Sequence, residues 1–199
     1  MKDFIIVSPK RKHQLERILT NKDHLIIMIK EETKSKIIAW HTRSSNENDP
    51  FIRFICEYLC LVAFLTHMYP QYYSDGPKIK RFLDNLKYQQ ENSQINERES
   101  QIVQKFHNKL DQRKLSNHIS YLKVYPLKYK LINRRLILLC INDLDDNYNM
   151  IKYLQYVRNN LFHEIKDPEG DRDKHIIEIG VDIITPFIES SNEYFRIYD

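Results

Sequence analysis

The chain of 199 residues contains only three glycines and seven prolines. All-β folds join many short strands through turns, and those turns are rich in glycine and proline. So few turn residues disfavour an all-β fold, while the abundance of Ile, Leu, Lys, Glu and Gln favours helices. The sequence therefore predicts an all-α fold, arranged as a bundle of about five to seven helices.

Apolar residues at helical spacing indicate where these helices lie. The strongest run covers 50–69, with apolar side chains at positions 51, 54, 55, 58, 59, 62 and 65. A short basic amphipathic helix is predicted over 78–90, on Ile79, Phe82, Leu83 and Leu86. A thinner stripe in 91–120 consists of Ile102, Val103, Phe106 and Leu110. The apolar segment 131–143 is predicted to be a short buried helix, and the Tyr/Lys-rich stretch before it is extended around Pro126.

The last two predicted helices have the clearest stripes. Asp145, Asp146 and Asn147 are capping residues for the first, and Asp167-Pro168 with Gly170 ends it. Its apolar stripe is Met150, Leu154, Val157, Leu161 and Ile165. The second helix is capped by Asp171 or Asp173, and Pro186 should kink it. Its predicted core side is Ile176, Ile177, Gly180, Ile183, Ile184 and Phe187.

Residues 49–199 are expected to form one helical domain. Residues 1–48 remain unassigned, as an N-terminal extension or a small irregular or mixed region, and 42–50 is expected to be a loop. The run at 51–69 is long enough to span a bilayer, but Arg53, Glu57 and His67 within it favour a core helix.

Charge and cysteine content bound the cellular setting. The net charge of +4 permits a polyanionic partner without requiring one. The three cysteines are Cys56, Cys60 and Cys140, an odd number without a dense pattern. Together with an N-terminus that lacks the apolar run of a signal peptide, they predict a reducing cytoplasm, where thiols act as small core residues. No zinc-ligand spacing is recognisable, so no metal is expected.

The first of the two last helices carries the sequence RNNLFH, with Arg158, Asn159 and His163. Cleavage of RNA by its own 2′-hydroxyl requires a base, a cation on the phosphate and an acid for the leaving oxygen. Histidine titrates near neutral pH, arginine binds phosphate oxygens bidentately, and asparagine can orient substrate or imidazole. Asn159 and His163 share a helix face, whereas Arg158 and His163 lie about 140° apart on an ideal helix. A helix end, or a second copy of the helix in a dimer, would bring them around one cleft.

Arginine followed five residues later by histidine is a weak signal by itself, because the same spacing occurs at Arg113 and His118. A looser version occurs at Arg17 and His24. The RNNLFH sequence differs in its context, since it lies on a strong apolar helix, ends at a stop and precedes another amphipathic helix. The C-terminal end of a helix also stabilises a protonated imidazole by about 0.3–1 kcal/mol, so we expect the pKa of His163 to be raised.

The sequence VRNNLFH, followed by a short loop and DRDKHIIEIGVDII, resembles the HEPN superfamily over about residues 145–190. The resemblance implies a HEPN-like helical bundle that dimerises and brings two copies of the motif into one cleft. It also implies a metal-independent endoribonuclease with Arg158 and His163 as catalytic residues and Asn159 assisting. HEPN proteins that contain the sequence RNNLFH often have glycine after the histidine, whereas this chain has Glu164.

Other residues are candidates for supporting roles. Asn160 is a candidate neighbour of the site, and Lys128, Lys130, Arg134 and Arg135 are candidate RNA-binding residues. For the Tyr/Lys stretch, a solvated connection is the alternative. Glu57 is expected to be a core carboxylate paired with a cation, or to face the cleft with Arg158 as its partner.

The sequence thus predicts a cytoplasmic, homodimeric HEPN-type endoribonuclease that needs no cofactor, acts on RNA and belongs to a bacterial toxin–antitoxin or phage-defence system. An antitoxin or another defence protein is an expected partner. The alternative is a catalytically silent HEPN module that dimerises and binds a protein, nucleotide or RNA, and Glu164 favours it. A third possibility is a helical nucleic-acid-binding adaptor that uses the basic helix at 78–87.

Overall fold

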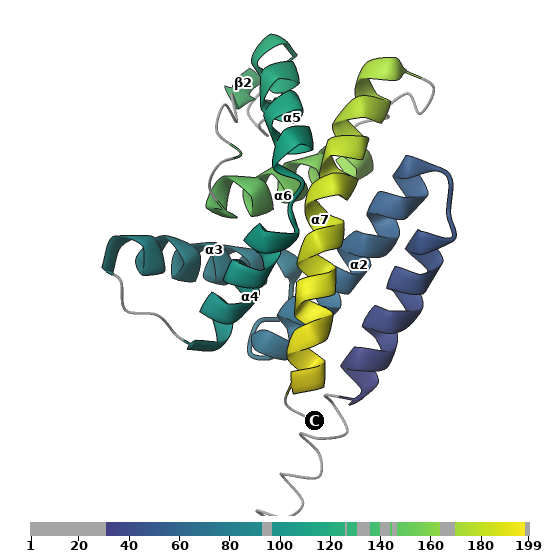
Figure 1. Ribbon diagram of the computed structural model, residues 1–199. Helices are drawn as coiled ribbons and strands as arrows, with labels where there is room; N and C mark the ends of the chain where they lie inside the picture. Colours follow the sequence, from purple (N-terminus) through teal and green to yellow (C-terminus); the bar gives the residue numbers. More distant parts are fainter. Residues whose placement is uncertain are drawn as a thin grey trace, which may run out of the picture.

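The computed structural model describes residues 31–92, 97–125, 127–130, 136–139, 144, 147–163 and 170–197. Within these residues the chain is a helical bundle with one short two-stranded ribbon (Figure 1). The predicted all-α bundle of five to seven helices is confirmed. The first described element is a helix over residues 31–45. The others are α2 (Pro50–Met68), α3 (Asp75–Asn92), α4 (Glu97–Lys109), α5 (Gln112–Val124), β1 (Leu127–Lys130), β2 (Leu136–Leu139), α6 (Asn147–His163) and α7 (Asp171–Ile197).

Helices α2 and α7 form the centre of the bundle. Helix α7 packs along α2 and also contacts α4 and α6 (Figure 1). Three aromatic rings meet the ring of Phe187 edge-on, at centroid distances of 5.8, 5.7 and 5.6 Å: Phe64, Phe82 and Phe106. Edge-to-face pairs of this kind each stabilise by about 0.5–1.5 kcal/mol beyond the area that they bury. The cluster therefore fastens α2, α3 and α4 to α7.

The apolar stripes predicted from the sequence form this core. The predicted positions that are buried are Phe54, Tyr58, Leu65, Ile79, Phe82, Leu83, Leu86, Ile102, Phe106, Leu110, Met150, Leu154, Val157, Ile176, Ile177, Gly180, Ile183, Ile184 and Phe187. Phe51, Ile55, Val62 and Leu161 are only partly buried, and Leu59 is exposed. The side chains of Val103 and Ile165 lie outside the described residues. The predicted apolar stripe on α2 therefore includes more of the helix surface than the bundle buries.

The prediction of a buried helix over 131–143 is wrong where the structure describes that segment. Leu136–Leu139 is a strand that pairs antiparallel with Leu127–Lys130, in a register that sets Leu127 opposite Leu139. A run of four apolar residues fits a buried strand as well as a helix, so periodicity does not separate the two. The extended conformation predicted after Pro126 is confirmed, and it supplies the partner strand.

Two loops are shorter than predicted. The helix over 31–45 includes the first part of the expected loop at 42–50. Asp49 then caps α2, with its carboxylate accepting from the Phe51 backbone N–H at 2.8 Å. The connection from α2 to α3 is also shorter, because α3 begins at Asp75, before the helix predicted over 78–90, and Pro77 fits the first turn of a helix. Pro186 lies inside α7.

The helix over 31–45 packs on the same core as α2. Ile37 is fully buried, and its carbonyl oxygen lies 3.4 Å from the Sγ atom of Cys60. Cys56 and Cys60 are buried free thiols, as predicted, and burial raises the pKa of both. The domain boundary at residue 48 stays a prediction, and residues 1–30 lie outside the described chain.

In the part of the chain that the structure describes, α2 is the one helix long and apolar enough to cross a membrane by length and composition. A core helix of a helical bundle meets the same criterion. Phe54, Leu61 and Phe64 of α2 are buried against other helices of the bundle, which accounts for its apolar character.

Gly180 marks the closest approach of α7 to α2. A Cβ atom at this position would lie 2.8 and 2.9 Å from two ring carbons of Phe54, which is itself fully buried. The Gly180→Ala variant should gain about 1 kcal/mol of helix propensity but lose about 1–3 kcal/mol to overpacking. We expect a net loss of about 1 kcal/mol in the free energy of unfolding, measured by urea denaturation.

The same substitution in a protein that also carries Phe54→Leu tests the cause of that loss in stability. In a Phe54→Leu chain the ring is absent, so Gly180→Ala should become neutral or stabilising. If Gly180→Ala destabilised both backgrounds equally, the contact with the Phe54 ring would not be its cause.

Candidate active site

Helix α6 sets the position of the predicted motif. Its residues Met150, Leu154 and Val157 are buried in the core, which fixes the rotation of the helix about its axis. Arg158 is next to Val157 and is only partly buried. Its Nη1 atom donates to the Asn159 side-chain oxygen at 3.1 Å. The core stripe therefore places Arg158 and Asn159 together at the edge of the bundle.

A further partner of Arg158 comes from α3. Its Nη2 atom lies 3.9 Å from a carboxylate oxygen of Asp75, and the two side chains are 31% and 36% exposed. An ion pair with this exposure contributes about 0–1 kcal/mol, so it orients the arginine more than it stabilises the fold. The guanidinium is held in place while part of it still faces solvent.

Arg158 and Asp75 line a pocket of about 100 Å³ against one side of α2. Its remaining lining is apolar and aromatic: Phe54, Ile55, Tyr58, Leu59 and Val62. Burial raises the pKa of Tyr58, the charge of Asp75 adds to this, and the charge of Arg158 opposes it. Tyr58 therefore stays a neutral phenol beside the arginine.

The exposed side of α2 continues from this pocket as an apolar strip. Ile52 and Leu59 are 39% and 37% exposed, and Ile55 lies between them on the same side of the helix. We call Ile52, Ile55, Leu59 and Val62 the α2 strip. It lies beside Arg158, because three of its four residues also line the pocket.

His163 is the last residue of α6. Its side chain lies outside the described residues, as does all of Glu164, so the structure places the histidine only by its backbone. The five-residue separation keeps it about 140° from Arg158 along the helix. The structure thus joins Arg158 to Asn159 and leaves the role and raised pKa of His163 as predictions.

Asn160 is 5% exposed and faces the inside of the bundle, unlike its neighbour Asn159. Lys128 and Lys130 lie two residues apart on β1, so they share one face of the ribbon. Their side chains, and all of Arg134 and Arg135, lie outside the described residues. Their role in RNA binding stays a prediction.

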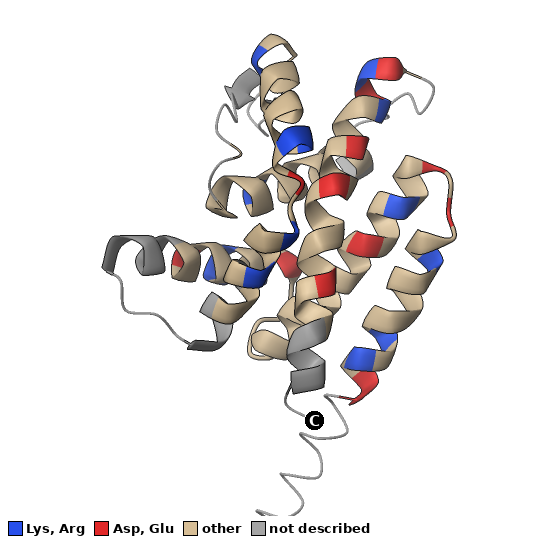
Figure 2. Ribbon diagram, viewed as in Figure 1, with Lys and Arg blue, Asp and Glu red and all other residues tan. Residues whose placement is uncertain are grey.

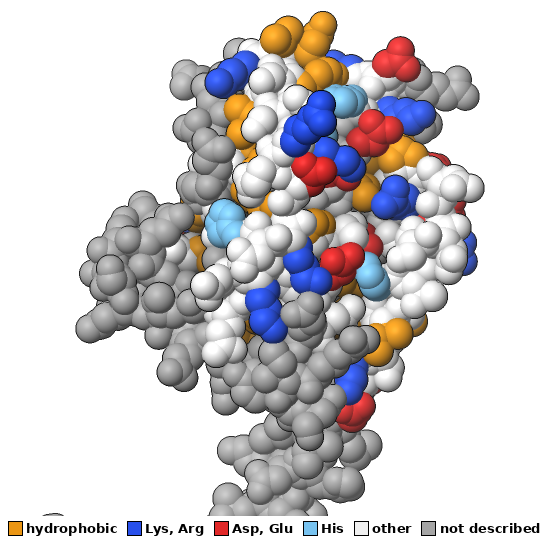
Figure 3. Space-filling view, viewed as in Figure 1, with side chains coloured by type: hydrophobic (Ala, Val, Ile, Leu, Met, Phe, Trp, Pro, Cys, Tyr) orange, Lys and Arg blue, Asp and Glu red, His pale blue; other side chains and the backbone are white. Residues whose placement is uncertain are grey.

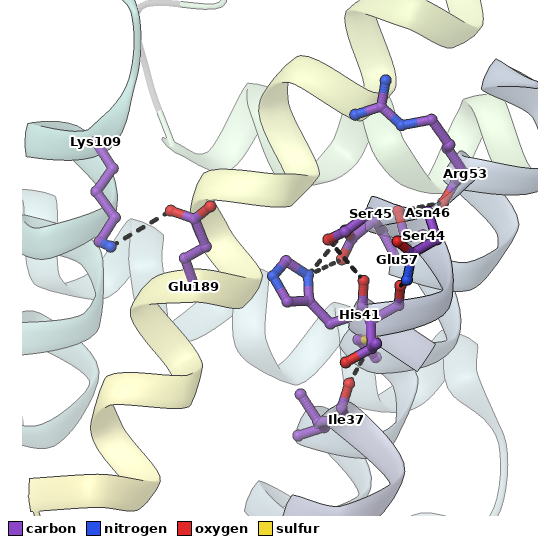
Figure 4. A network of polar contacts seen from close by, with 11 residues as sticks. Ile37, His41, Ser44, Ser45, Asn46, Arg53, Glu57, Lys109 and Glu189 are labelled. Atoms are coloured by element: carbon purple, nitrogen blue, oxygen red, sulfur yellow. Dashed lines mark hydrogen bonds and ion pairs between the residues drawn. The ribbon is translucent and has the colours of Figure 1, made fainter. Parts of the chain in front are cut away.

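Glu57 is buried and paired, but its partner is not Arg158. Its two carboxylate oxygens lie 2.9 and 3.2 Å from the Nδ1 atom of His41, on the helix over 31–45 (Figure 4). The expected partner is therefore His41, which is a cation when protonated, and the alternative contact with Arg158 is wrong. Position 57 lies on a different side of α2 from the pocket, which is why the two groups do not meet.

This pair gives the fold a pH dependence. The hydrogen bond with Glu57 raises the pKa of His41 above 6.5, the charges of Glu57 and Glu189 add to it, and burial opposes it. Because the folded-state pKa is raised, the stability from protonated His41 is fully present below about pH 6.5. It is lost as the pH rises through the folded-state pKa.

We therefore expect the free energy of unfolding to fall more between about pH 5.5 and about pH 8.5 in the wild type than in His41→Gln. Urea denaturation at both pH values measures this difference. Parallel decreases in the two proteins would show that another group causes the pH dependence.

The second arginine–histidine pair of this spacing has a different setting. His118 is 8% exposed, and its Nε2 atom lies 3.1 Å from a carboxylate oxygen of Asp182 on α7. Arg113 is exposed at the start of α5. This histidine is therefore held between α5 and α7.

Sequence reasoning missed Tyr58 and Asp75 as neighbours of Arg158. Tyr58 belongs to the predicted apolar stripe, and Asp75 lies before the helix predicted over 78–90. Neither position signals proximity to residue 158, because tertiary packing alone brings them there. No protein-family model, curated protein or solved structure matches this chain.

Proposed function

We propose that the chain is a HEPN-type endoribonuclease in which Arg158 binds the scissile phosphate, His163 transfers the proton and Asn159 assists. One observation supports the proposal most strongly. The Arg158 guanidinium, oriented by Asn159 and Asp75, stands partly exposed at the rim of a pocket. A cation held in this way is prepared to bind an anionic phosphodiester.

The proposed reaction needs only the RNA and these side chains. The ribose 2′-hydroxyl attacks the adjacent phosphorus, and its proton goes to the neutral imidazole of His163. The bond from phosphorus to the 5′-oxygen of the next nucleotide breaks, and that oxygen takes up a proton from a protonated imidazole. The products are a 2′,3′-cyclic phosphate and a 5′-hydroxyl. Arg158 stabilises the charge that develops on the nonbridging oxygens.

A homodimer would complete this site, because positions 158 and 163 are about 140° apart around an ideal helix. The α2 strip supports this arrangement. It is an exposed apolar surface directly beside Arg158, and such surfaces are typical of protein contacts. A second copy seated on it would bring the two α6 helices towards one cleft, with RNA bound between them. A cytoplasmic toxin or defence system with a protein antitoxin is the setting that we propose.

The proposal is tested by incubating RNA with the wild type and with His163→Ala in EDTA. We expect cleavage by the wild type only, with at least about 100-fold less by the variant. Equal cleavage by both proteins would remove His163 from the reaction. Circular dichroism of both proteins controls for folding.

The catalytically silent module remains the second candidate, and one observation favours it. Arg158 already has partners in Asn159 and Asp75, as a purely structural arginine would. In that case the wild type would bind its partner without cutting RNA, and His163→Ala would leave the binding unchanged.

A further inference from the structure

A second cavity among the described residues lies away from Arg158. It has a volume of about 180 Å³ and lies between α2, α7 and the corner where α4 ends and α5 begins. Its polar lining is Arg53, Lys109, Asp111, Lys114, His118, Asp182 and Thr185. Arg53 and Ile55 lie about 200° apart around α2, so this cavity and the Arg158 pocket are on opposite sides of that helix.

Two polar groups in this cavity lack a partner within the described chain. The Nε atom of Arg53 and the Oγ1 atom of Thr185 are both buried, and neither has a hydrogen bond. Figure 4 shows the Arg53 guanidinium directed away from the His41–Glu57 pair, with no contact drawn to it. Buried donors without acceptors are costly, so this arrangement favours a ligand that brings acceptor oxygens.

The charges of the cavity also favour an anion. Lys114 and His118 both contact Asp182, at 3.3 and 3.1 Å, so that carboxylate is already shared by two donors. The hydrogen bond from His118 and the charge of Lys114 keep the pKa of Asp182 low against the opposing effect of burial. Asp111 accepts from two backbone N–H groups at the start of α5. The acidic groups are therefore engaged within the protein.

The basic groups exceed these acidic ones. Lys109 lies 3.4 Å from Glu189, and Arg53 has no ion pair within the described residues. Figure 3 shows basic and acidic side chains gathered over the face that α5 and α7 form, and Figure 2 shows acidic residues spaced along α7. Guanidinium, ammonium and hydroxyl donors that converge on one cavity match the oxygens of a tetrahedral anion.

We propose that this cavity binds the phosphate group of a small phosphorylated ligand, with Arg53 and Thr185 as the donors that contact it. A cavity of about 180 Å³ is smaller than the usual site for a whole cofactor, about 300–1,000 Å³, so it takes a phosphate rather than a stacked base. The same chemistry accepts inorganic phosphate or a phosphate monoester.

The test is isothermal titration of inorganic phosphate and of ribose 5-phosphate into the full-length chain and three variants. The variants are Arg53→Gln, Thr185→Val and the control Arg81→Gln, which changes an exposed arginine on α3. We expect saturable binding by the wild type and the control, at least about tenfold weaker binding by Arg53→Gln, and a smaller loss for Thr185→Val. Circular dichroism checks the fold of each variant. If Arg53→Gln does not fold, the binding measured for Thr185→Val tests the proposal, because valine is close in shape to threonine.

Tighter binding of ribose 5-phosphate would identify an ester as the ligand, and equal binding would identify free phosphate. No saturable binding of either probe by the wild type, or unchanged binding by both Arg53→Gln and Thr185→Val, would overturn the proposal. The readout is binding without RNA, so the result stands apart from that of the ribonuclease test.

Discussion

Replacing Arg158 by glutamine should lower the rate of RNA cleavage by about 100- to 1,000-fold, the usual effect of removing one preorganised group that stabilises transition-state charge. Glutamine can still form a hydrogen bond near Asn159. It lacks the positive charge and the bidentate geometry with which arginine binds phosphate oxygens. The fold should change little, because the side chain is 31% exposed and its ion pair with Asp75 is weak. Initial rates at saturating RNA measure the effect.

Arg113→Gln is the matched control for this prediction. Arg113 also precedes a histidine by five residues, but it is exposed at the start of α5. The Arg113→Gln variant should cleave RNA at the wild-type rate. A similar loss in both variants would mean that arginines contribute through overall charge, and that Arg158 has no special position.

The largest expected effect on stability is that of Phe54→Ala. Phe54 is fully buried, stacks on Tyr58 at a centroid distance of 5.9 Å and faces Gly180 across the α2–α7 contact. Removing the ring leaves a cavity at the centre of the bundle, so we expect a loss of about 3–5 kcal/mol in the free energy of unfolding. Thermal and urea denaturation measure this loss.

Tyr73→Ala removes an aromatic ring of similar size from a fully exposed position. Its effect should stay within about 0.5 kcal/mol. A small loss for Phe54→Ala would place the α2–α7 contact outside the stable core and contradict the fold described here.

Most of the core was predictable because a helix shows its buried side as a period in the sequence. The stripes on α3 and α7 are buried as expected, including Gly180, and so are Met150, Leu154 and Val157 on α6, where Leu161 is only partly buried. The strand at Leu136–Leu139 was not predictable in the same way, since four apolar residues carry no period. The stripe on α2 overestimates the core, because Leu59 is exposed and Phe51, Ile55 and Val62 are only partly buried.

The candidate site was predictable only in part, because sequence spacing describes neighbours on one helix. The contact between Arg158 and Asn159 joins adjacent residues, so it was predictable from the sequence. Tyr58 and Asp75 come from other helices, and nothing in their local sequence points to residue 158. His41 lies in the region left unassigned from the sequence, so the sequence did not name it as the partner of Glu57.

The most direct test of the central claim is mass spectrometry of the RNA ends that the wild-type protein leaves in EDTA. Attack by the 2′-hydroxyl predicts fragments with 2′,3′-cyclic phosphate and 5′-hydroxyl ends, because the proposed reaction uses only Arg158, Asn159 and His163. Fragments with 3′-hydroxyl and 5′-phosphate ends would mean that water attacks the phosphorus, which contradicts the account.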